Sequence, residues 1–455
     1  MTTEHTYAPD RDETTPADTV RGDEPGRPAR ISRTAWWVFL GLAVLGLLSV
    51  LPTVNSWSDA SRMATIQAIV EHHTFSIDRT VFLPTGDKVL VDGHYYSDKL
   101  AGPALIGAVV YYPIHALGFE LAYGWNVAYY LITLLTVKVF WLAGLIAFYK
   151  SLGYTPLADR KRLWLTLALG VGSLYFTWSA TFNNHSLAAS WVAIGFFFML
   201  RARHGFHVGR SLFVAGLFFS LCGGTDVPIF AVYGCFFLYV LAQRTLRRNA
   251  GWYLLPLVVT AAPALVVNYS ISGSLVPVQL VADYFAWPGT PWTPEELTGG
   301  GANSGRFLAE YAFTALIGSR GFLLYNPLMW LAIPLAVREL VRRRPFAREA
   351  AVAGVVTVVI VAYYLLFSNN YSGWSYSIRW FVPLLPLLLF FLYPVLDSHV
   401  TLKVLFALLL LAGTAVAVIG VTKPWSNMSL SDYPLVANLH SLPKQIADGR
   451  KALFG

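Results

Sequence analysis

Residues 55–102 read NSWSDASRMATIQAIVEHHTFSIDRTVFLPTGDKVLVDGHYYSDKLAG and decide how the whole chain is interpreted. This segment follows a long apolar run that ends near residue 54, and a second apolar run begins near residue 101. Six carboxylates and four lysine or arginine side chains lie within it. A segment this long and this acidic between two apolar runs is more than a connector. We therefore expect it to carry polar chemistry at the edge of a membrane.

The composition is typical of a membrane protein. Of the 455 residues, 56% are hydrophobic and only 13% are charged. Several continuous apolar runs reach the roughly 20 residues that a helix needs to cross a hydrocarbon core of about 30 Å. A transmembrane β-barrel would instead show short segments of alternating hydrophobicity. The sequence therefore predicts an all-α, polytopic helical membrane protein.

The apolar runs predict about 11 to 13 transmembrane helices. One run, residues 101–119, can be interpreted in two ways. If it crosses the membrane, the basic cluster at 160–162 and every later basic loop lie outside; if it is re-entrant or interfacial, all basic clusters lie inside. The preference of lysine and arginine for cytoplasmic loops favours the second arrangement. The other spans are predicted near residues 34–54, 124–149, 162–181, 186–201, 210–224, 227–243, 252–271, 322–341, 350–367, 379–396 and 402–421.

Three regions follow from this pattern. Residues 1–33 are polar and rich in Thr, Pro and Asp, which is typical of a disordered cytoplasmic tail. Residues 34–421 form the transmembrane domain, which carries long extracytoplasmic loops at 55–100 and 272–321. Residues 422–455 are expected to form an extracytoplasmic C-terminal tail.

Other classes of protein are disfavoured. The net charge of +8 arises from short basic clusters between apolar runs, which indicates cytoplasmic loops and no nucleic-acid partner. Cys222 and Cys235 form neither a disulfide framework nor a CxxC motif. His72 and His73 are adjacent and have no obvious third ligand, so no metal site is predicted there. The sequence has no Walker loop, no GxGxxG after a strand, no GxSxG and no HExxH, which disfavours a cytosolic nucleotide as a donor substrate.

Asp59 is the first candidate for a catalytic residue. It lies in SWSDAS, about one helical turn beyond the first predicted span. A carboxylate at the edge of a low-dielectric region can act as a general base on an acceptor hydroxyl. Arg62, one turn away on the same helical face, can tune its pKa and contact a substrate. The alternative role of Asp59 is a helix N-cap, and the two roles are compatible.

Lys99 is the first candidate for a phosphate contact. It lies in DGHYYSDKLAGP, just before an apolar run, where a lysine either snorkels toward water or binds the phosphate of a lipid carrier. Asp98 beside it can orient Lys99 or serve as its counter-ion. Tyr95 and Tyr96 fit an aromatic belt at the membrane interface and a platform for a sugar ring equally well.

Two arginines are further candidates for binding the phosphate of a donor. Arg379 opens a predicted span at its outer end, against the positive-inside bias, and can hold a phosphate bidentately or form a structural ion pair. Arg320, in GSRGFLLYNP, is placed in the same way. The aromatic residues around Arg379, including Trp374 and Tyr376, are candidates for stacking on sugar rings.

Two short polar turns complete the predicted site. Asn183, Asn184 and His185 lie between two spans, where they can hydrogen-bond a sugar, supply a base or simply form the turn. Asp226 follows two glycines and opens a span. A carboxylate there fits the helix macrodipole, but an acid at the membrane is also a candidate for a functional site.

Taken together, these motifs resemble those of the integral-membrane GT-C glycosyltransferases. Within them, the chain is similar to bacterial members related to protein O-mannosyltransferases and to the aminoarabinose transferases of lipid A. Asp59 matches their acidic residue near the start of the first outer loop, and Tyr96 to Lys99 match a Tyr-x-x-Lys-Pro-Pro-type motif. VEHHTFSIDR and DGHYYSDK are similar to the same loop, and GSRGFLLYNP and GWSYSIRWFVPLLP resemble later outer segments. The similarity is best in the N-terminal half.

The resemblance implies a GT-C-like fold and an inverting transfer of a sugar from a polyprenyl-phosphate donor to an extracytoplasmic acceptor hydroxyl. Asp59 would then deprotonate the acceptor, while Lys99 and Arg379 hold the leaving phosphate. The chain departs from the family pattern where Leu100 and Ala101 replace two prolines, and where asparagines replace a second acid in the next outer loop. No cofactor is therefore assigned, although a divalent metal is possible.

The expected partners are a polyprenyl-phosphate sugar donor, a glycan, lipid or protein acceptor, and the bilayer itself. The expected location is the bacterial plasma membrane, with the site on the extracytoplasmic side. The alternative function is that of a transporter or flippase for a lipid-linked or small polar solute. A transporter should place polar residues along a path at the membrane midplane with paired broken helices, whereas here the charges concentrate in the outer loops.

Overall fold

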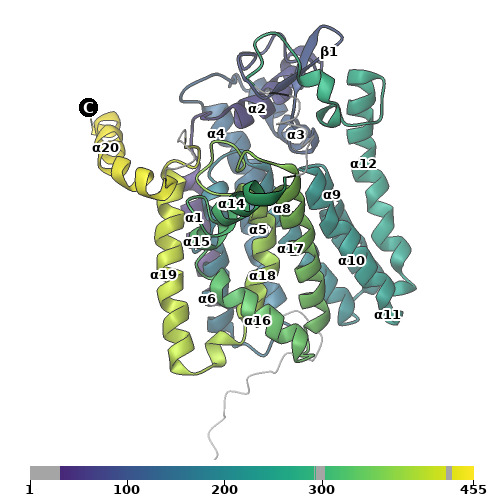
Figure 1. The fold of residues 1–455 in the computed structure, drawn as a ribbon, viewed down its shortest axis with the longest axis vertical. Helices are drawn as coiled ribbons and strands as arrows, with labels where there is room; N and C mark the ends of the chain where they lie inside the picture. Colours follow the sequence, from purple (N-terminus) through teal and green to yellow (C-terminus); the bar gives the residue numbers. More distant parts are fainter. Residues whose placement is uncertain (1–30, 292, 294–302, 427–432, 455) are drawn as a thin grey trace, which may run out of the picture.

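The computed structural model describes residues 31–291, 293, 303–426 and 433–454. The tail predicted to be disordered, residues 1–33, therefore lies almost wholly outside the described residues. Within them the chain is mostly helical, and its sheet is a single hairpin of two short strands (Figure 1). The prediction of an all-α polytopic membrane protein is confirmed.

The helices are short near the predicted outer loops and long elsewhere. In the first half of the chain they are α1 (Arg33–Ser49), α2 (Trp57–His72), α3 (Gly102–Ala116), α4 (Val127–Thr133), α5 (Val139–Leu152), α6 (Asp159–Gly170), α7 (Leu174–Trp178), α8 (Asn184–Arg203) and α9 (Val208–Gly223). In the second half they are α10 (Ala231–Ala242), α11 (Arg244–Arg247), α12 (Ala250–Ser272), α14 (Gly305–Leu316), α15 (Phe322–Tyr325), α16 (Met329–Val341), α17 (Ala347–Phe367), α18 (Leu385–Leu389), α19 (Val400–Thr422) and α20 (Pro434–Phe454).

The chain crosses the membrane several times. Six helical segments are long and apolar enough to span it, and three further apolar helices, Arg33–Ser49, Val208–Gly223 and Val227–Ala242, are shorter. The six are Val127–Leu152, Asn184–Arg203, Ala250–Ser272, Ala347–Phe367, Arg379–Asp397 and Val400–Thr422. Each of them overlaps a span predicted from hydropathy, so the protein is a multi-pass membrane protein.

The span predicted at 162–181 is not one helix. α6 ends at Gly170, and the short α7 begins after Ser173, whose hydroxyl caps it. The break is fixed from outside, because the side-chain oxygen of Asn326 accepts a hydrogen bond from the backbone N–H of Leu174 at 2.9 Å. Hydropathy does not detect this interruption because the residues on both sides of it are apolar.

The segment 55–100 is folded rather than open. Its first part is α2, which is buried along most of its length and packs against α3. Ser56 caps α2 by accepting a hydrogen bond from the backbone N–H of Asp59 at 3.0 Å, so the cap considered for Asp59 is provided by its neighbour. The strands β1 (Lys88–Val91) and β2 (His94–Ser97) then form an antiparallel hairpin whose Asp-Gly turn has positive φ at both residues, as a type I′ turn requires.

The apolar run at 101–119 forms α3, which has 15 residues. At 1.5 Å per residue it is about 22 Å long, shorter than a hydrocarbon core of about 30 Å. Figure 1 places α3 beside α2 at the upper end of the molecule. This arrangement agrees with a re-entrant or interfacial segment, which stays a prediction.

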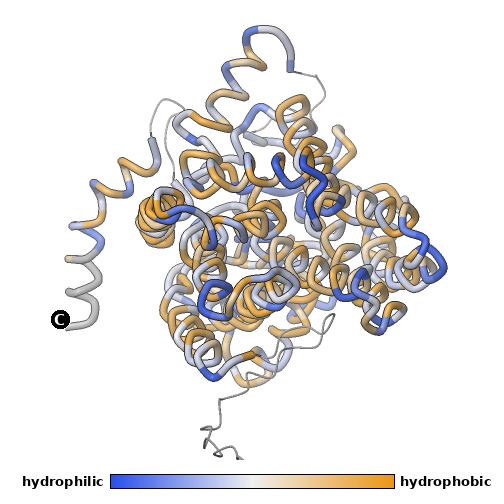
Figure 2. The backbone as a smooth tube through the Cα atoms, turned by 90° about the horizontal axis from the view of Figure 1, so that it is seen from below, coloured by the Kyte–Doolittle hydropathy of each residue, from blue (hydrophilic) through white to orange (hydrophobic). Residues whose placement is uncertain are grey.

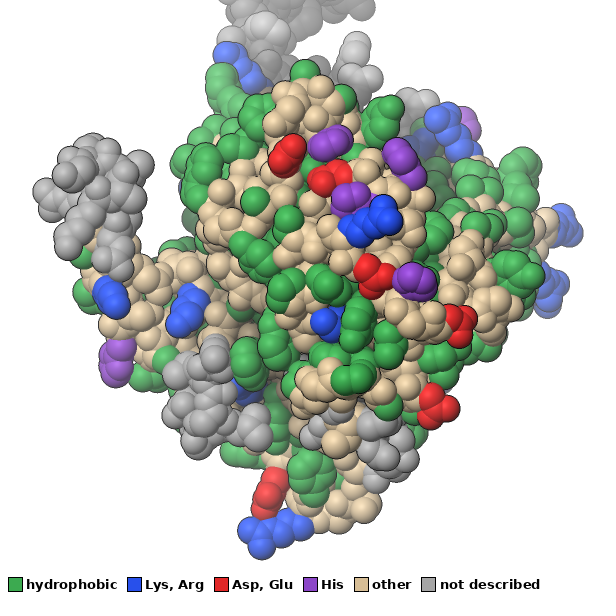
Figure 3. Space-filling model, turned by 90° about the horizontal axis from the view of Figure 1, so that it is seen from above, with side chains coloured by type: hydrophobic (Ala, Val, Ile, Leu, Met, Phe, Trp, Pro, Cys, Tyr) green, Lys and Arg blue, Asp and Glu red, His purple; other side chains and the backbone are tan. Residues whose placement is uncertain are grey.

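Charged side chains lie at both ends of the molecule. α17 and α19 begin at the lower end in Figure 1, where Arg203 pairs with Glu349 and Lys161 pairs with Asp397. Figure 2, seen from below, shows hydrophilic segments at the connections between apolar helices. Figure 3, seen from above, shows acidic, histidine and basic side chains on the upper face. The upper end is therefore the one that carries the predicted outer loops.

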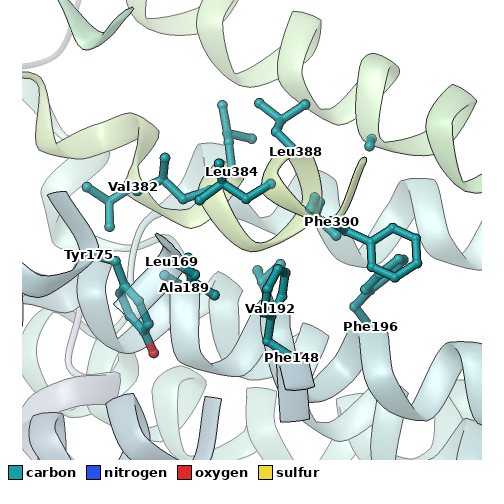
Figure 4. Packing of buried hydrophobic residues seen from close by; sticks show 14 of the residues in the cluster. Phe148, Leu169, Tyr175, Ala189, Val192, Phe196, Val382, Leu384, Leu388 and Phe390 are labelled. Carbon is teal, nitrogen blue, oxygen red and sulfur yellow. The ribbon is translucent and has the colours of Figure 1, made fainter. Parts of the chain in front are cut away.

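α8 forms the centre of the largest apolar cluster. Figure 4 shows Ala189, Val192 and Phe196 of this helix facing the broken segment that contains Val382 and Phe390. Phe196 meets Phe390 edge to face, with ring centroids 5.1 Å apart. Because α8 is almost completely enclosed, it is a rigid support for the residues at its upper end.

The packing of α9 on α12 predicts that alanine substitutions at two glycines will change the stability of the protein by different amounts. A Cβ atom on Gly216 of α9 would overlap the carbonyl oxygen of Tyr253 on α12, whereas a Cβ on Gly234 of α10 would meet nothing within 4 Å. We expect Gly216→Ala to destabilise the protein by about 1–3 kcal/mol, because backbone on a packed helix yields poorly. Gly234→Ala should be neutral or stabilising. Thermal unfolding in detergent measures both, and equal unfolding midpoints for the two variants would contradict the helix pairing.

Candidate active site

A cavity of about 920 Å³ opens at the upper end of the molecule. α2 and the end of the hairpin form one wall, and the first residues of α8 with the turn after α9 form the next. The upper end of α17 and the residues that follow α19 complete it. Its charged and imidazole side chains are those of Arg62, Asp87, Asp98, Lys99, His185, Asp226, Arg379 and Lys423. The predicted site residues from four distant parts of the sequence therefore meet in one cavity.

Lys99 is held between two carboxylates. Its Nζ lies 2.7 Å from Asp98 Oδ2 and 2.9 Å from Asp87 Oδ2. Burial lowers the pKa of Lys99, but the two carboxylates outweigh it and the pKa is raised. Lys99 therefore stays charged, and its side chain is 21% exposed to the cavity. Asp98, considered from sequence as a counter-ion of Lys99, lies within ion-pair distance of it, and so does Asp87.

Arg62 connects α2 to α8 through hydrogen bonds. Its Nη1 donates to the carbonyl oxygen and to the hydroxyl of Ser58, and its Nη2 donates to Asn184 Oδ1 at 2.8 Å. The amide nitrogen of Asn184 in turn donates to the carbonyl oxygen of Thr225 at 2.9 Å. Both polar ends of Asn184 are thus engaged with protein. Its contribution to the cavity is to position Arg62 and the turn that precedes Asp226.

Arg379 enters the cavity with unused donors. Its Nε and Nη1 atoms are buried and have no hydrogen-bond partner among the described residues. Its guanidinium carbon lies 4.6 Å from the centre of the Trp425 ring, which is a cation–π contact. A buried guanidinium with free N–H groups is costly unless an anion receives them. Arg379 is therefore suited to bind an anion that enters the cavity.

Asp226, His185 and Tyr364 form a second polar group on the cavity wall. The Tyr364 hydroxyl donates to Asp226 Oδ2 at 2.5 Å, and His185 Nε2 lies 3.9 Å from the same oxygen. The Asp226 side chain is 27% exposed. Burial raises the pKa of Asp226, while the Tyr364 hydrogen bond and Arg379 act against this rise.

Asp59 lies behind the cavity wall rather than on it. Its carboxylate is fully buried, and Oδ2 accepts hydrogen bonds from Trp425 Nε1 at 2.9 Å and from the Tyr129 hydroxyl at 3.2 Å. Its Oδ1 has no partner among the described residues. Burial raises its pKa to about 6, while Arg62 acts in the opposite direction. Burial and Arg62 thus act in opposite directions on the pKa of Asp59, and its side chain does not line the cavity.

Besides Asp59, five predicted residues do not line the cavity. Arg320 Nη1 donates to the carbonyl oxygen of Ser375, and Asn183 caps α8. The remaining three are tyrosines, and all of them pack within the protein. The Tyr376 hydroxyl donates to the Val416 carbonyl oxygen, Tyr95 meets the ring of Trp287, and Tyr96 packs in the small cluster under the hairpin. Trp374 does line the cavity, where it pairs with Trp57 at a centroid distance of 5.7 Å.

Sequence reasoning missed three important side chains. Asp87 was counted among the acids of the first loop, but nothing in its spacing showed that it reaches Lys99. Tyr364 lies inside an apolar run, where a tyrosine is usually packed. Trp425 follows the last span and reaches Asp59 and Arg379 only through the fold. No sequence signal separates these residues from the many other aromatic residues of the chain.

Metal binding gains no support from the described residues. No group of three or more His, Cys, Asp or Glu side chains among them is placed to hold a metal ion. Two carboxylates of the cavity, Asp87 and Asp98, converge on the ammonium of Lys99 instead.

Comparison with known proteins relates this chain to others through its fold. No protein-family model matches the sequence, and no curated protein matches it significantly. The fold is similar to the crystal structure of ArnT from Cupriavidus metallidurans bound to undecaprenyl phosphate. The TM-score is 0.53 at 17% identity, over 91% of this chain and 72% of that chain. The apo structure of the same protein gives a TM-score of 0.53 at 15% identity over the same shares of the two chains.

An archaeal structure is a more distant neighbour. The oligosaccharyltransferase of Archaeoglobus fulgidus in its apo form gives a TM-score of 0.48 at 12% identity, over 88% of this chain and 57% of that chain. The chain therefore shares the fold of ArnT, in agreement with the GT-C-like fold that the resemblance of its motifs implied.

The buried carboxylate of Asp59 predicts a pH-dependent effect on stability. Its pKa rises from 3.8 to about 6 on folding. A raised pKa stabilises the folded state below pH 4, and this stabilisation, about 3 kcal/mol, is lost as the pH rises through 6. Asp59→Asn removes the titration. We therefore expect the difference in unfolding midpoint, Asp59→Asn minus wild type, to be larger at pH 7.5 than at pH 4.5.

The matched control is Asp283→Asn, which changes an exposed carboxylate in the segment Ala282–Phe285. This variant should differ from wild type by the same small amount at both pH values. A difference between Asp59→Asn and wild type that does not change with pH would show that the Asp59 carboxylate is not desolvated in the folded protein.

Proposed function

We propose that this protein is a glycosyltransferase of the cell envelope that uses a polyprenyl-phosphate sugar as its donor. The acceptor is a hydroxyl on an extracytoplasmic glycan, lipid or protein. Three features support this proposal: the GT-C fold, a polar cavity at the upper ends of the membrane helices, and cationic side chains that converge on it. The similar ArnT structure contains undecaprenyl phosphate, a ligand of the same class.

The observation that carries the proposal is the state of Arg379. Two of its nitrogen atoms are buried without partners among the described residues, and its side chain lines a cavity that also contains Arg62 and Lys99. Phosphate oxygens can receive several N–H groups at once, and a guanidinium binds them in a fixed fork geometry. A neutral solute could accept these hydrogen bonds but could not balance the positive charge. A phosphate monoester or diester therefore fits this part of the cavity better than an uncharged sugar does.

Lys99 supplies the second positive charge. In the structure its ammonium is shared by Asp87 and Asp98, and part of its side chain remains exposed. An incoming phosphate can share this ammonium at the exposed side while the carboxylates hold the lysine in place. The phosphate would then lie between Lys99 and Arg379, where the charge that develops on the leaving group is stabilised.

The position of the cavity suits a substrate that stays in the membrane. Tyr363 and Phe367 of the spanning helix α17 line it, together with Val227 at the start of a shorter apolar helix. All three side chains are more than one third exposed on the surface. A polyprenyl chain can lie against this apolar side while its phosphate reaches Arg379. An acceptor from water would enter from the hairpin side of the cavity.

The proposed reaction is an inverting displacement at the anomeric carbon of the donor. The acceptor oxygen attacks this carbon, the bond to the phosphate oxygen breaks, and the proton of the acceptor passes to a base. Asp59 is the base predicted from sequence, and this role stays a prediction because its oxygens are enclosed. Asp226, which lines the cavity, is the other carboxylate to consider.

The proposed location is the bacterial plasma membrane, with the cavity on the extracytoplasmic side. The basic clusters at the opposite end of the molecule support this orientation. The alternative function, a transporter or flippase, predicts that the bound lipid leaves unchanged. Release of free polyprenyl phosphate together with a new glycosidic product would distinguish the transferase from a carrier.

Arg379→Met is expected to weaken the binding of a short-chain polyprenyl monophosphate by about 10–100-fold, because one charge-assisted interaction of about 1.5–3 kcal/mol is lost. Arg379→Lys should retain part of the affinity. Lys99→Ala should weaken binding at least as much, since it also leaves Asp87 and Asp98 without their counter-ion. Binding to purified protein in detergent can be measured by calorimetry.

The control is Arg306→Met, which removes an exposed arginine whose ion pair is with Glu310 four residues away. Its affinity for the lipid should equal that of wild type. Equal affinity of wild type and Arg379→Met would remove Arg379 from the donor site. The absence of specific binding by wild type would contradict the proposed donor class and favour a carrier or scaffold.

A further inference from the structure

We infer that Asp226, rather than Asp59, accepts the proton of the acceptor hydroxyl, and that His185 and Tyr364 are positioning residues for it. This inference rests on the proposed glycosyltransferase function and assigns a role within the same cavity. It is carried by three observations: access to the cavity, the distribution of cations around the carboxylates, and the way the turn that holds Asp226 is fixed.

Access distinguishes Asp226 from Asp59. A general base must come within about 2.6–3.2 Å of the atom that carries the proton, directly or through one water. Asp59 is fully buried, and its Oδ2 is already occupied by Trp425 and Tyr129. Asp226 lines the cavity with 27% of its side chain exposed. Its described hydrogen bond is to Oδ2, and none is described for Oδ1.

The distribution of cations separates Asp226 from the other two carboxylates on the wall. Asp87 and Asp98 each form an ion pair with Lys99 at less than 3 Å. An adjacent ammonium stabilises the carboxylate anion and lowers its ability to take a proton. Asp226 has no lysine or arginine within ion-pair distance among the described residues, and its near neighbour is the imidazole of His185. Asp226 is therefore the one carboxylate of the cavity wall that no lysine or arginine pairs with among the described residues.

The turn that carries Asp226 is fixed against the segment that carries Lys99. A Cβ atom on Gly102, three residues after Lys99, would overlap the carbonyl oxygen of Gly224, two residues before Asp226. The two backbones therefore touch without intervening side chains. This contact holds a constant spacing between the ammonium that faces the phosphate and the carboxylate that faces the acceptor, as an in-line displacement requires.

Tyr364 is positioned to orient the carboxylate. Its ring stacks on Trp380 at 4.2 Å with an interplanar angle of 7°, and its hydroxyl donates to Asp226 Oδ2. The Tyr364 hydrogen bond anchors Oδ2. His185 Nε2 lies 3.9 Å from the same oxygen, and its Nδ1 is buried without a partner among the described residues. Both residues thus limit the rotation of Asp226 without occupying its free oxygen.

The step is balanced within these groups. The acceptor oxygen forms a bond to the anomeric carbon, and the bond from that carbon to the phosphate oxygen breaks. The bonding electron pair leaves with the polyprenyl phosphate, whose charge faces Lys99 and Arg379. The acceptor proton moves to Asp226 Oδ1 and later returns to water. No oxidant, reductant or other co-reactant is needed.

The pH dependence of this step involves every charged group around Asp226. Burial raises the pKa of Asp226, and the Tyr364 hydrogen bond and three nearby cations act against the rise. Activity that depends on ionised Asp226 should fall as the pH drops through its pKa. The groups that face this carboxylate are His185 on α8, Tyr363 and Tyr364 on α17, Arg62 on α2, and Lys99 and Arg379.

The test compares Asp226→Asn with Asp59→Asn in the full-length protein. Short-chain polyprenyl phosphates that carry mannose, galactose or arabinose serve as donors, and octyl glycosides serve as acceptors. Loss of a general base is expected to lower the single-turnover rate by at least about 100-fold in Asp226→Asn, with a smaller loss in Asp59→Asn. Binding of the polyprenyl monophosphate should be unchanged in Asp226→Asn, and Asp283→Asn should behave as wild type.

Two further measurements separate a base from a structural residue. Tyr364→Phe removes a hydrogen bond that stabilises the Asp226 anion, so the acid limb of the pH–rate profile should move to higher pH. Carbodiimide labelling followed by mass spectrometry requires no knowledge of the sugar. It should modify Asp226 and spare Asp59, which is enclosed.

Three outcomes would overturn the inference. The first is a rate for Asp226→Asn within about threefold of wild type while Asp59→Asn is inactive, since a base cannot be dispensable. The second is labelling of Asp59 with protection of Asp226, which decides the question even where none of the three donors is turned over. The third is the absence of lipid-phosphate binding by wild type. This result contradicts the proposed function itself, and the binding measurement distinguishes it from a failure of the Asp226 assignment alone.

Discussion

The hydrogen bonds of Arg62 hold the cavity together. Arg62 is only 3% exposed, and its two terminal nitrogens donate to acceptors on its own helix and on α8, while Nε has no partner among the described residues. Asn184 extends the connection to the turn before Asp226. The first folded loop, the central membrane helix and a third part of the chain are thus joined by one buried cation. Removal of this cation would leave several polar groups unpaired at once, which makes the cavity a cooperative unit.

The sequence predicts correctly those features that depend on a local property of the chain, such as the length of an apolar run. Long apolar runs predicted the spanning helices, because hydrocarbon thickness fixes their length. The polar segment before Lys99 was predicted as an outer loop, and the hairpin with its Asp92-Gly93 turn was not predicted. Lys99, Arg62, Arg379, Asp226 and His185 were all proposed as site residues, and all line one cavity.

The predicted site residues that do not line the cavity show where sequence patterns are insufficient. Arg320 and Arg379 have the same sequence context at the start of an apolar segment, yet one donates to a backbone carbonyl and the other faces the cavity. Tyr376 and Trp374 are two residues apart, and only the tryptophan points inward. Asp59 was placed at the right end of the right helix but on its enclosed face. Side-chain direction in irregular segments is set by tertiary packing, which no local pattern records.

The hydrogen bond from Trp425 to Asp59 joins residues separated by 366 positions. During synthesis, α2 leaves the ribosome long before α19 and the residues beyond it exist. The Asp59 carboxylate therefore spends most of translation without one of its two donors, in contact with water or lipid headgroups. The cavity wall closes only after the last of the long apolar helices has been inserted. A chain that ends before this helix would lack Trp425, and its cavity wall would stay open. The folding of this region therefore depends on completion of the last long apolar helix.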